Sequence, residues 1–331
     1  DKLYFEPIFW ERVLDVIEHE RPVGVIVQHG GQTALKIGQR IGETETKILG
    51  TAISDMDLAE DRGKFSSLLK HLEIPFAPYG MAKTVNEAVK VAESIGYPLL
   101  VRPNYVLGGQ GMRIAINKEE VEEYVSAIWS LLPNNPILLD LFLENAIELD
   151  VDAIADGHEV FIAGIMQHIE PAGVHSGDST AVLPPYSLSD EIIRTIERYT
   201  TEIALKLKVV GLINVQFAVK ENTVFVIEAN PRASRTVPFV AKATGIPVAN
   251  IGTKLMLGES LASFREQGLL TSTLQGFAMK EPVFSWDKFP EVTKELGPEM
   301  KSTGEAIAFI DELTDEHFRR PYEMRNLYLS R

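Results

Sequence analysis

The most constraining feature of the sequence is a pair of alternating apolar runs, residues 214–220 and 223–230, joined by Glu221-Asn222. A period of two around a two-residue turn predicts a β-hairpin. Side chains two apart on a strand leave the same face, so Glu228 and Asn230 point the same way, with Gln216 across the hairpin. One carboxylate and two amides in an apolar setting suit a hard cation such as Mg²⁺, which takes oxygen ligands and often phosphate.

Two arginines, Arg232 and Arg235, follow this cluster at once and favour one of two interpretations. The alternative is a hairpin end with solvated polar residues, which is common at protein surfaces. A carboxylate–amide cluster beside two guanidinium groups is instead typical of a site for a metal ion and phosphate. We therefore predict metal ligation by Gln216, Glu228 and Asn230.

Composition limits what the chain can be. Its 331 residues are enough for two or three compact units, and a formal net charge of −15 argues against broad nucleic-acid binding. No apolar run approaches the ~20 residues that span a bilayer. The chain has no cysteine and its N-terminus lacks a signal-peptide profile, so we expect a cytoplasmic protein without nucleic-acid or membrane partners. The lack of an initiator Met is consistent with a fragment of a longer protein.

Periodicity divides the rest of the chain into regions. Residues 1–60 predict one part of a doubly wound parallel layer, including a strand over 23–27 that is buried on both faces and a short strand over 47–50. Residues 77–136 predict a small unit of two helices on a few strands. The remaining α+β body contains a second predicted hairpin, which begins at Glu148, and a long amphipathic helix over 189–207.

A glycine loop, Gly108-Gly109-Gln110-Gly111, lies between two predicted strands of the small unit. Glycine permits backbone conformations closed to other residues and lets phosphate approach main-chain N–H groups. The loop does not match the P-loop pattern, and glycines spaced like this more often mark ordinary turns. We interpret the loop as a flap over a nucleotide, with Arg102 reaching phosphates from the preceding strand.

Two further segments carry polar side chains. Residues 172–179 form a loop of small and polar residues with one histidine, His175, and either present backbone groups to a ligand or form a solvated surface loop. Glu148, Asp150 and Asp152 share one face of a strand, where carboxylates can bind a cation or ribose hydroxyls. For Asp150 and Asp152 we expect instead an exposed acidic face of a half-buried strand.

These signals, in this order and spacing, resemble the ATP-grasp superfamily, and within it the large subunits of carbamoyl phosphate synthase. The resemblance covers roughly residues 1–305 and is carried by strings such as VRPNYVLGGQGM, EPAGVHSGDS, GLINVQFAVK and NPRASRTVPF. Such a subunit has two homologous synthetase halves. The strings look like the second half, which phosphorylates carbamate, with Thr236-Val237 after Arg235.

The resemblance implies a fold of the α/β (α+β) class with three parts. A truncated, Rossmann-like pre-ATP-grasp subdomain would occupy residues 1–61, and an ATP-grasp domain residues 62–305. Within the latter, residues 77–136 would form a small lid that carries the glycine flap. The tail over 306–331 does not match the regulatory domain that follows in the family, so we expect no allosteric control through such a domain.

The resemblance also implies a role for each matching residue. Catalysis would rest on Arg102, Asn230, Arg232 and Arg235, and metal binding, by Mg²⁺ or Mn²⁺, on Gln216, Glu228 and Asn230. K⁺ would bind near Glu148, His168, Val174 and Ser179. The residues implied in binding ATP are Arg62, Arg102, Gly108, Gly109, Leu141, Leu143, Glu148, Gly173, Val174, His175, Ser176, Gln216 and Glu228.

The implied activity is that of a ligase, the ATP-dependent phosphorylation of carbamate to carbamoyl phosphate, which feeds pyrimidine and arginine biosynthesis. The implied partners in the parent enzyme are an N-terminal synthetase half and a glutaminase small subunit. Two alternatives stay open: another ATP-grasp ligase such as a biotin carboxylase, or a fragment that binds nucleotide without net synthesis. Gln110 departs from the arginine that family members often carry in the glycine loop.

Overall fold

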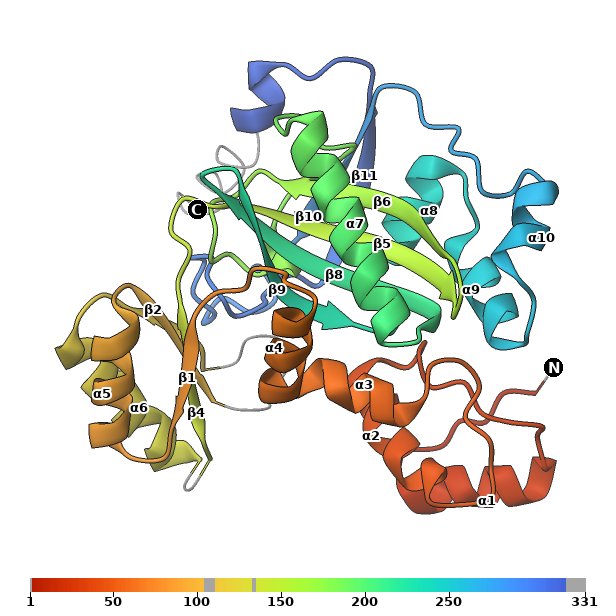
Figure 1. The fold of residues 1–331 in the computed structure, drawn as a ribbon, viewed down its shortest axis with the longest axis horizontal. Helices are drawn as coiled ribbons and strands as arrows, with labels where there is room; N and C mark the ends of the chain where they lie inside the picture. The colour runs from red at the N-terminus through yellow and green to blue at the C-terminus, as the bar shows by residue number, and fades with distance from the viewer. Residues whose placement is uncertain (1, 104–110, 133–134, 320–331) are drawn as a thin grey trace.

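The computed structural model describes residues 2–103, 111–132 and 135–319 (Figure 1). None of the helices in these residues is long and apolar enough to cross a bilayer. The helices are α1 Trp10–Glu20, α2 Gly31–Gly42, α3 Ile53–Glu60, α4 Arg62–His71, α5 Val85–Ile95, α6 Lys118–Leu131, α7 Asp190–Lys206, α8 Val237–Thr244, α9 Val248–Met256 and α10 Leu261–Glu266, with a 3₁₀ turn, η1, at Ser176–Asp178. The strands are β1 Tyr79–Ala82, β2 Leu99–Pro103, β3 Arg113–Ala115, β4 Ile137–Leu141, β5 Ile147–Asp156, β6 Val160–His168, β7 Ala181–Leu183, β8 Val210–Lys220, β9 Thr223–Asn230, β10 Phe277–Val283 and β11 Gly304–Ile310.

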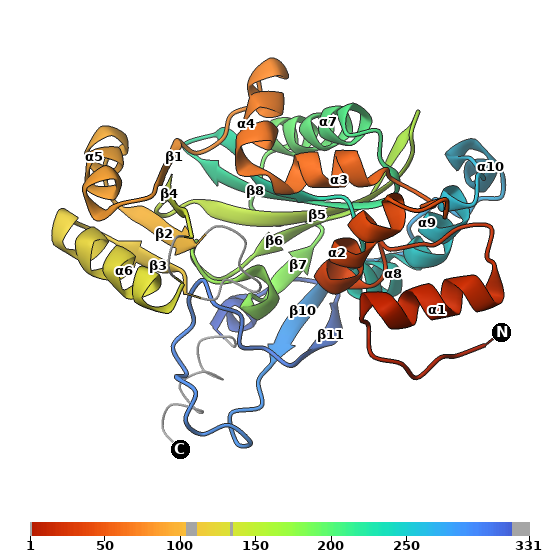
Figure 2. The same ribbon diagram turned by 90° about the horizontal axis from the view of Figure 1, so that it is seen from below.

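A seven-stranded antiparallel sheet, in the order β11-β10-β7-β6-β5-β8-β9, forms the centre of the molecule (Figures 1 and 2). Neighbouring strands run antiparallel, and both faces of the central strands carry buried apolar side chains. One face packs against α4 and α7 through residues such as Phe65, Ile196 and Phe217. The other packs against α8 and α9 through residues such as Val240 and Ile251. Burying both faces fixes the register of each strand, because a slip of one residue would exchange the two faces.

The predicted hairpin is confirmed as β8 and β9. Gln216 lies opposite Glu228 in the register, and Asn214 lies opposite Asn230. The second predicted hairpin is also confirmed, as β5 and β6, and β5 pairs with β8 along its whole length. The polar side chains of three neighbouring strands are therefore brought onto one face of the sheet.

The small unit predicted over 77–136 forms a second sheet, in the order β1-β4-β2-β3, covered by α5 and α6 (Figure 1). Thr84 caps α5: its Oγ1 accepts from the Glu87 amide, and the Glu87 carboxylate accepts in return from the Lys83 amide at 2.8 Å, one residue before the amide that a capping box uses. Two of its strands, β1 and β4, are not predicted by sequence periodicity. The predicted flap glycines Gly108 and Gly109 lie outside the described residues.

The N-terminal region differs from the expectation of a strand buried on both faces. Residues 23–27 and 47–50 do run parallel, but they make a single bridge between Val25 and Ile48, and Val23 is 88% exposed. The expectation was wrong because, among the described residues, this segment pairs on one side only. At the other end of the chain, β11 runs from Gly304 to Ile310 and so continues past the expected boundary at residue 305.

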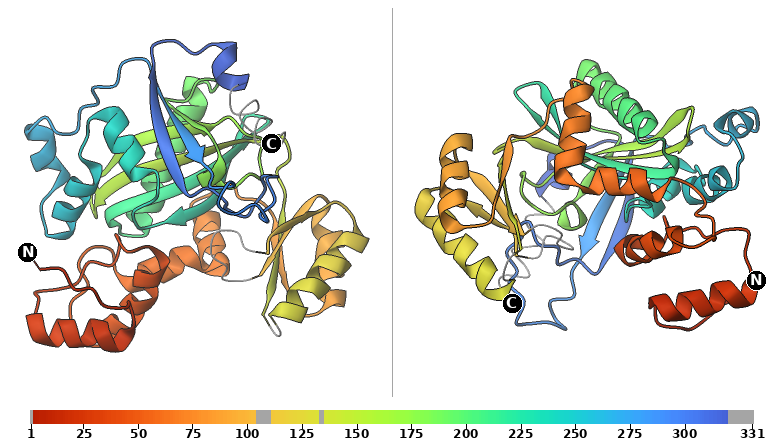
Figure 3. Two further views of the ribbon diagram at one scale, coloured as in Figure 1. Left: turned by 180° about the vertical axis from the view of Figure 1, so that it is seen from behind. Right: turned by 60° about the horizontal axis from the view of Figure 1, so that its bottom comes forward.

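A buried amide, Gln28, which is 0% exposed, helps to join the N-terminal region to the large sheet. Its side-chain nitrogen donates to Thr51 Oγ1 at 2.8 Å and to the Val210 carbonyl at 2.9 Å, and its oxygen accepts from the Leu212 amide at 3.0 Å. Its own carbonyl accepts from the Ala233 amide at 3.0 Å. The region therefore contacts both the start of β8 and the segment that carries the two arginines. Figure 3 shows the N-terminal region, in red, beside the helices and strands of the large sheet.

We expect Gln28→Leu to lower the free energy of unfolding by about 1–3 kcal/mol, because the buried Leu212 amide loses its acceptor and the Val210 carbonyl keeps only its longer contact with Thr51 Oγ1, at 3.2 Å. Urea denaturation measures the change. The matched control is Gln39→Leu, which removes an exposed hydrogen bond to Asp57 Oδ1 of 2.8 Å and should cost less than about 0.5 kcal/mol. Equal effects of the two substitutions would contradict this account of the junction.

Candidate active site

A cavity of about 470 Å³ opens between the large sheet and the second sheet. Every predicted site residue that the structure describes lines it, apart from those suggested for K⁺ alone. The residues brought together are Arg62, Arg102, Leu141, Leu143, Glu148, Gly173, Val174, His175, Ser176, Gln216, Glu228, Asn230, Arg232 and Arg235. They come from two lobes of the molecule, the large sheet with its helices and the second sheet with its helices. A ligand that fills the cavity therefore contacts both lobes.

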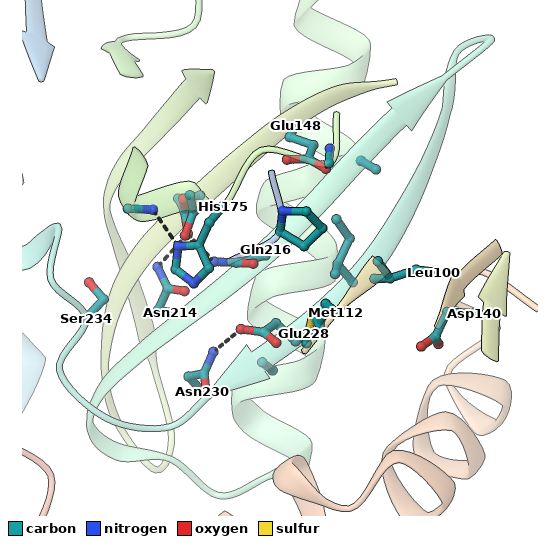
Figure 4. Close-up of a pocket in the computed structure, with 18 of the residues that line it drawn as sticks. Leu100, Met112, Asp140, Glu148, His175, Asn214, Gln216, Glu228, Asn230 and Ser234 are labelled. Carbon is teal, nitrogen blue, oxygen red and sulfur yellow. Dashed lines mark hydrogen bonds between the residues drawn. The ribbon is translucent and has the colours of Figure 1, made fainter. Parts of the chain in front are cut away.

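Three predicted metal ligands lie on one wall of the cavity (Figure 4). Asn230 Nδ2 donates to Glu228 Oε1 at 2.8 Å, and Asn230 Oδ1 accepts from Arg232 Nη2 at 3.2 Å. Gln216 Nε2 donates to Asp150 Oδ1 and to Ser176 Oγ, both at 3.0 Å. Because these two acceptors fix the amide nitrogen of Gln216, its carbonyl oxygen is left for another partner. The donor set of one carboxylate and two amide oxygens fits a hard divalent cation.

Two arginines from the other side of the cavity share one carboxylate that the sequence analysis missed. Asp140, on β4, accepts from Arg62 Nη2 at 2.6 Å and from Arg102 Nε at 3.0 Å. Asp140 is 7% exposed, and Arg62 also donates to the Ile227 carbonyl at 3.1 Å. The available signal was a lone acidic residue in the apolar run ILLDL, since a buried carboxylate is rarely unpaired.

Two of the arginines at this cavity each have one buried guanidinium nitrogen. Among the described residues, Arg62 Nε and Arg232 Nε have no hydrogen-bond partner. A buried donor without an acceptor costs free energy unless a ligand or water supplies one. Their positions at one cavity therefore favour an anionic ligand.

The loop over 172–179 lies at the cavity and is not a solvated surface loop. The Gly173 amide donates to Glu148 Oε1 at 3.2 Å, and the Gly177 amide donates to His175 Nδ1 at 3.0 Å. Burial lowers the pKa of His175, so its ring is neutral at neutral pH. A second basic residue, Lys280 on β10, was missed by the sequence analysis: it is 1% exposed and its Nζ donates to the Ser176 carbonyl at 3.0 Å.

The expectation of an exposed acidic face at Asp150 and Asp152 was wrong. Asp150 is 3% exposed and Asp152 is 1% exposed. Both carboxylates have polar partners on other elements, which the sequence of β5 alone does not reveal. Asn214 Nδ2, on β8, donates to Asp150 at 3.2 Å and to Asp152 at 2.9 Å. His168 Nε2 lies 2.8 Å from Asp150 Oδ2. Burial opposes the charge of His168, but the carboxylates of Asp150 and Glu148 outweigh it and raise its pKa to about 9.

The pH dependence of folding stability tests the surroundings of the Asp152 carboxyl group. Burial raises its pKa to about 6, against the hydrogen bonds from Thr236, Asn214 and Ser234. A carboxyl group that holds its proton more tightly in the folded state stabilises the fold below its unfolded pKa, and the contribution is lost as the pH rises through 6. We therefore expect the stability of the wild type relative to Asp152→Asn to fall by about 2 kcal/mol between pH 4.5 and 7.5.

Urea denaturation at the two pH values measures this change. The control is Asp156→Asn, since backbone N–H donors outweigh burial and lower the pKa of Asp156, which places its titration below this window. A relative stability of the Asp152 variant that does not change with pH would show that the carboxylate stays ionised throughout.

Solved structures of low sequence identity share this architecture. A biotin carboxylase–β-γ-ATP complex from Campylobacter jejuni superposes with a TM-score of 0.69 at 17% identity, over 84% of this chain and 63% of that chain. The biotin carboxylase domain of a 2-oxoglutarate carboxylase from Hydrogenobacter thermophilus, in complex with MgADP, ADP and bicarbonate, gives 0.72 at 17% identity, over 93% and 76%. This likeness concerns the fold alone and confirms the expected ATP-grasp architecture.

Sequence relatives are much more similar. The carbamoyl phosphate synthase large chain of Archaeoglobus fulgidus is 54% identical over 93% of this chain and 28% of that protein. The C-terminal section of the large chain of Aquifex aeolicus is 48% identical over 100% of this chain and 65% of that protein. This chain thus spans less than a third of the first relative and about two thirds of the second.

Two family profiles match adjacent parts of the sequence. The carbamoyl phosphate synthase preATP-grasp domain matches residues 1–58, and the carbamoyl-phosphate synthase L chain, ATP binding domain matches residues 61–264. The second match alone covers more than half of the residues, and the two together include every predicted site residue. The chain therefore belongs to the carbamoyl phosphate synthase large-chain family.

Proposed function

We propose that this chain uses ATP to phosphorylate carbamate, with carbamoyl phosphate and ADP as products. The observation that carries the proposal is the arrangement at one cavity of a carboxylate–amide cluster and arginines from both lobes. Such a cavity can hold a nucleotide, a divalent cation and a small anion together. The high identity to carbamoyl phosphate synthase large chains, including a C-terminal section, supports carbamate as the acceptor.

The nucleotide would lie between the two sheets. Leu141 and Leu143 would pack against the base and Glu148 would bind ribose hydroxyls, while Arg62 and Arg102 would contact phosphates; all five line the cavity. The loop around His175 and Ser176 would close one side of the cavity, and Gly108 and Gly109 would belong to the flap. Arg62 Nε offers a donor that has no partner among the described residues, as a phosphate contact requires.

Mg²⁺, or Mn²⁺ in its place, would be held by Gln216, Glu228 and Asn230 and, when bound, would neutralise charge on the phosphate oxygens. A K⁺ ion would bind near Glu148, His168, Val174 and Ser179, where Glu148 Oε2 lies 3.8 Å from His168 Nδ1. In the parent enzyme, an N-terminal synthetase half would supply carbamate and a glutaminase subunit the ammonia.

The chemistry leaves little covalent work to the protein. An oxygen of carbamate forms a bond to the γ-phosphorus as the bond from that phosphorus to the β–γ bridging oxygen breaks, and ADP leaves. Arg232 and Arg235 would hold the carbamate and the transferred group, since guanidinium groups bind planar anions with paired N–H donors. Orientation by these groups and exclusion of water would account for most of the acceleration.

The partial reverse reaction tests the proposal, because one transition state serves both directions. The chain is incubated with Mg-ADP and carbamoyl phosphate, and ATP is measured by luciferase luminescence. We expect ATP formation that requires both substrates and is not stimulated by biotin. ATP hydrolysis that responds to biotin and bicarbonate, without ATP formation from carbamoyl phosphate, would favour the carboxylase alternative. Nucleotide binding without either reaction would favour a binding fragment.

A further inference from the structure

The two arginines that face the cavity lie on a short connection without regular secondary structure. Residues 231–236 leave β9 after Asn230 and enter α8 at Val237. Arg232 and Arg235 both line the cavity, and Arg235 also contacts Met300 and Ser302. The Ala233 amide donates to the Gln28 carbonyl, and the Thr236 carbonyl accepts the first helical hydrogen bond of α8 from the Val240 amide. Because backbone bonds hold so little of this segment, side-chain contacts with other elements must help to fix its conformation.

Asp152, on the central strand β5, makes the polar contacts that this connection needs. Ser234 Oγ donates to Asp152 Oδ1 at 2.7 Å, and Thr236 Oγ1 donates to Asp152 Oδ2 at 2.6 Å. Asn214 on β8 donates to Asp152 Oδ1 at 2.9 Å, which fixes the carboxylate from the sheet. Figure 4 shows Ser234 near Asn214; both side chains donate to Asp152 Oδ1.

Four side-chain oxygens of this cluster, two from Asp152 and one each from Ser234 and Thr236, are joined by three short contacts. Besides the two contacts with Asp152, Ser234 Oγ and Thr236 Oγ1 lie 2.8 Å apart. Two hydroxyl protons, both donated to an ionised Asp152, leave the contact between the two hydroxyls without a proton. When Asp152 is protonated, Oδ2 donates to Thr236 Oγ1, Thr236 then donates to Ser234 Oγ, and all three contacts hold a proton. An asparagine at this position would supply the same donor and acceptor, because its amide can donate to Thr236 while its oxygen accepts from Ser234.

We propose that Asp152 is a positioning residue that fixes residues 231–236 and thereby aims Arg232 and Arg235 into the cavity. It does not line the cavity itself, so it acts on a ligand only through the segment. The inference rests on the proposed function for the consequence of moving the arginines, but the anchoring itself can be measured without any activity.

The experiment compares the full chain as wild type, Asp152→Ala, Asp152→Asn and Thr200→Val. Thr200 is a matched control for the loss of a buried hydrogen bond, since it is 0% exposed and its hydroxyl donates to the Ile196 carbonyl at 2.8 Å within α7. Hydrogen exchange, followed by mass spectrometry, reports on peptides that span residues 231–237. The assay for ATP formation from Mg-ADP and carbamoyl phosphate, run where every variant is folded, reports on the arginines.

We expect Asp152→Ala to raise amide exchange in this segment at least about tenfold, with little change elsewhere in the large sheet. It should lower kcat/KM for carbamoyl phosphate by about tenfold to a hundredfold, because the guanidinium groups of Arg232 and Arg235 would shift by about 1 Å. The Kd for Mg-ADP should stay within about twofold of the wild-type value. Asp152→Asn should restore both properties to within about threefold of wild type. Thr200→Val should change neither.

Three results would overturn the inference: exchange in this segment like that of Thr200→Val, exchange that rises equally throughout the sheet, or unchanged kinetics with carbamoyl phosphate despite a loosened segment. If the wild type forms no ATP, the proposed function fails, and exchange alone then decides whether Asp152 fixes the segment. The two failures are thus told apart.

Discussion

Glu228→Gln is expected to lower the rate of phosphoryl transfer at least about a hundredfold while leaving the fold intact. Glutamine keeps the shape of the side chain and can still accept from Asn230 Nδ2, a contact of 2.8 Å in the wild type. What it removes is the one negative charge of the predicted metal cluster of Gln216, Glu228 and Asn230. ATP formation from Mg-ADP and carbamoyl phosphate, measured over a range of Mg²⁺ concentrations, gives the size of the loss.

The control for this substitution is Glu221→Gln, which makes the same chemical change in the exposed turn of the same hairpin. It should leave the rate within about twofold of wild type and show that the hairpin tolerates the loss of a charge. A Glu228→Gln variant that is folded and keeps more than about a tenth of the wild-type rate would remove the carboxylate from the metal site.

Asp140→Ala is expected to lower the free energy of unfolding by about 3 kcal/mol. The substitution leaves the guanidinium groups of Arg62 and Arg102 close together without the carboxylate that both contact, at 2.6 and 3.0 Å. The side chain of Asp140 is 10% exposed, so water replaces its charge poorly. Urea denaturation in the absence of nucleotide measures the cost, and added Mg-ADP should recover part of it by placing phosphate between the arginines.

The matched control is Glu159→Ala, which breaks an ion pair of similar length, 2.8 Å to Arg265 Nη2, between side chains that are 48% and 56% exposed. Exposed pairs contribute at most about 1 kcal/mol. If both substitutions cost the same, Asp140 does not bridge the two arginines in the folded protein.

The sequence was sufficient for features that depend on neighbours along the chain. Alternation around Glu221-Asn222 predicts the hairpin and the shared face of Glu228 and Asn230, and the cap at Thr84 predicts the start of α5. Both depend on backbone geometry over a few residues. That the site residues of both lobes line one cavity was implied by the family resemblance. The spacing of these residues along the sequence does not by itself show that the two lobes lie side by side.

Features that depend on distant segments were missed. Asp150 and Asp152 alternate with apolar residues, as a half-exposed strand would, but β5 lies between β6 and β8 in the middle of the sheet. The carboxylates are buried because His168, Asn214, Ser234 and Thr236 reach them from elements that no local pattern connects to β5. Lys280, on β10, likewise reaches the cavity through strand order alone.

The central claim is that one Mg²⁺–nucleotide complex contacts both lobes across this cavity. Isothermal titration with Mg²⁺ and a non-hydrolysable ATP analogue tests it most directly, in the wild type, Arg102→Ala, Glu228→Gln and the control Arg265→Ala. We predict one binding site, weakened at least about tenfold by Arg102→Ala from one lobe and by Glu228→Gln from the other, and unchanged by Arg265→Ala. No saturable binding, or binding that neither Arg102→Ala nor Glu228→Gln weakens, would contradict the account.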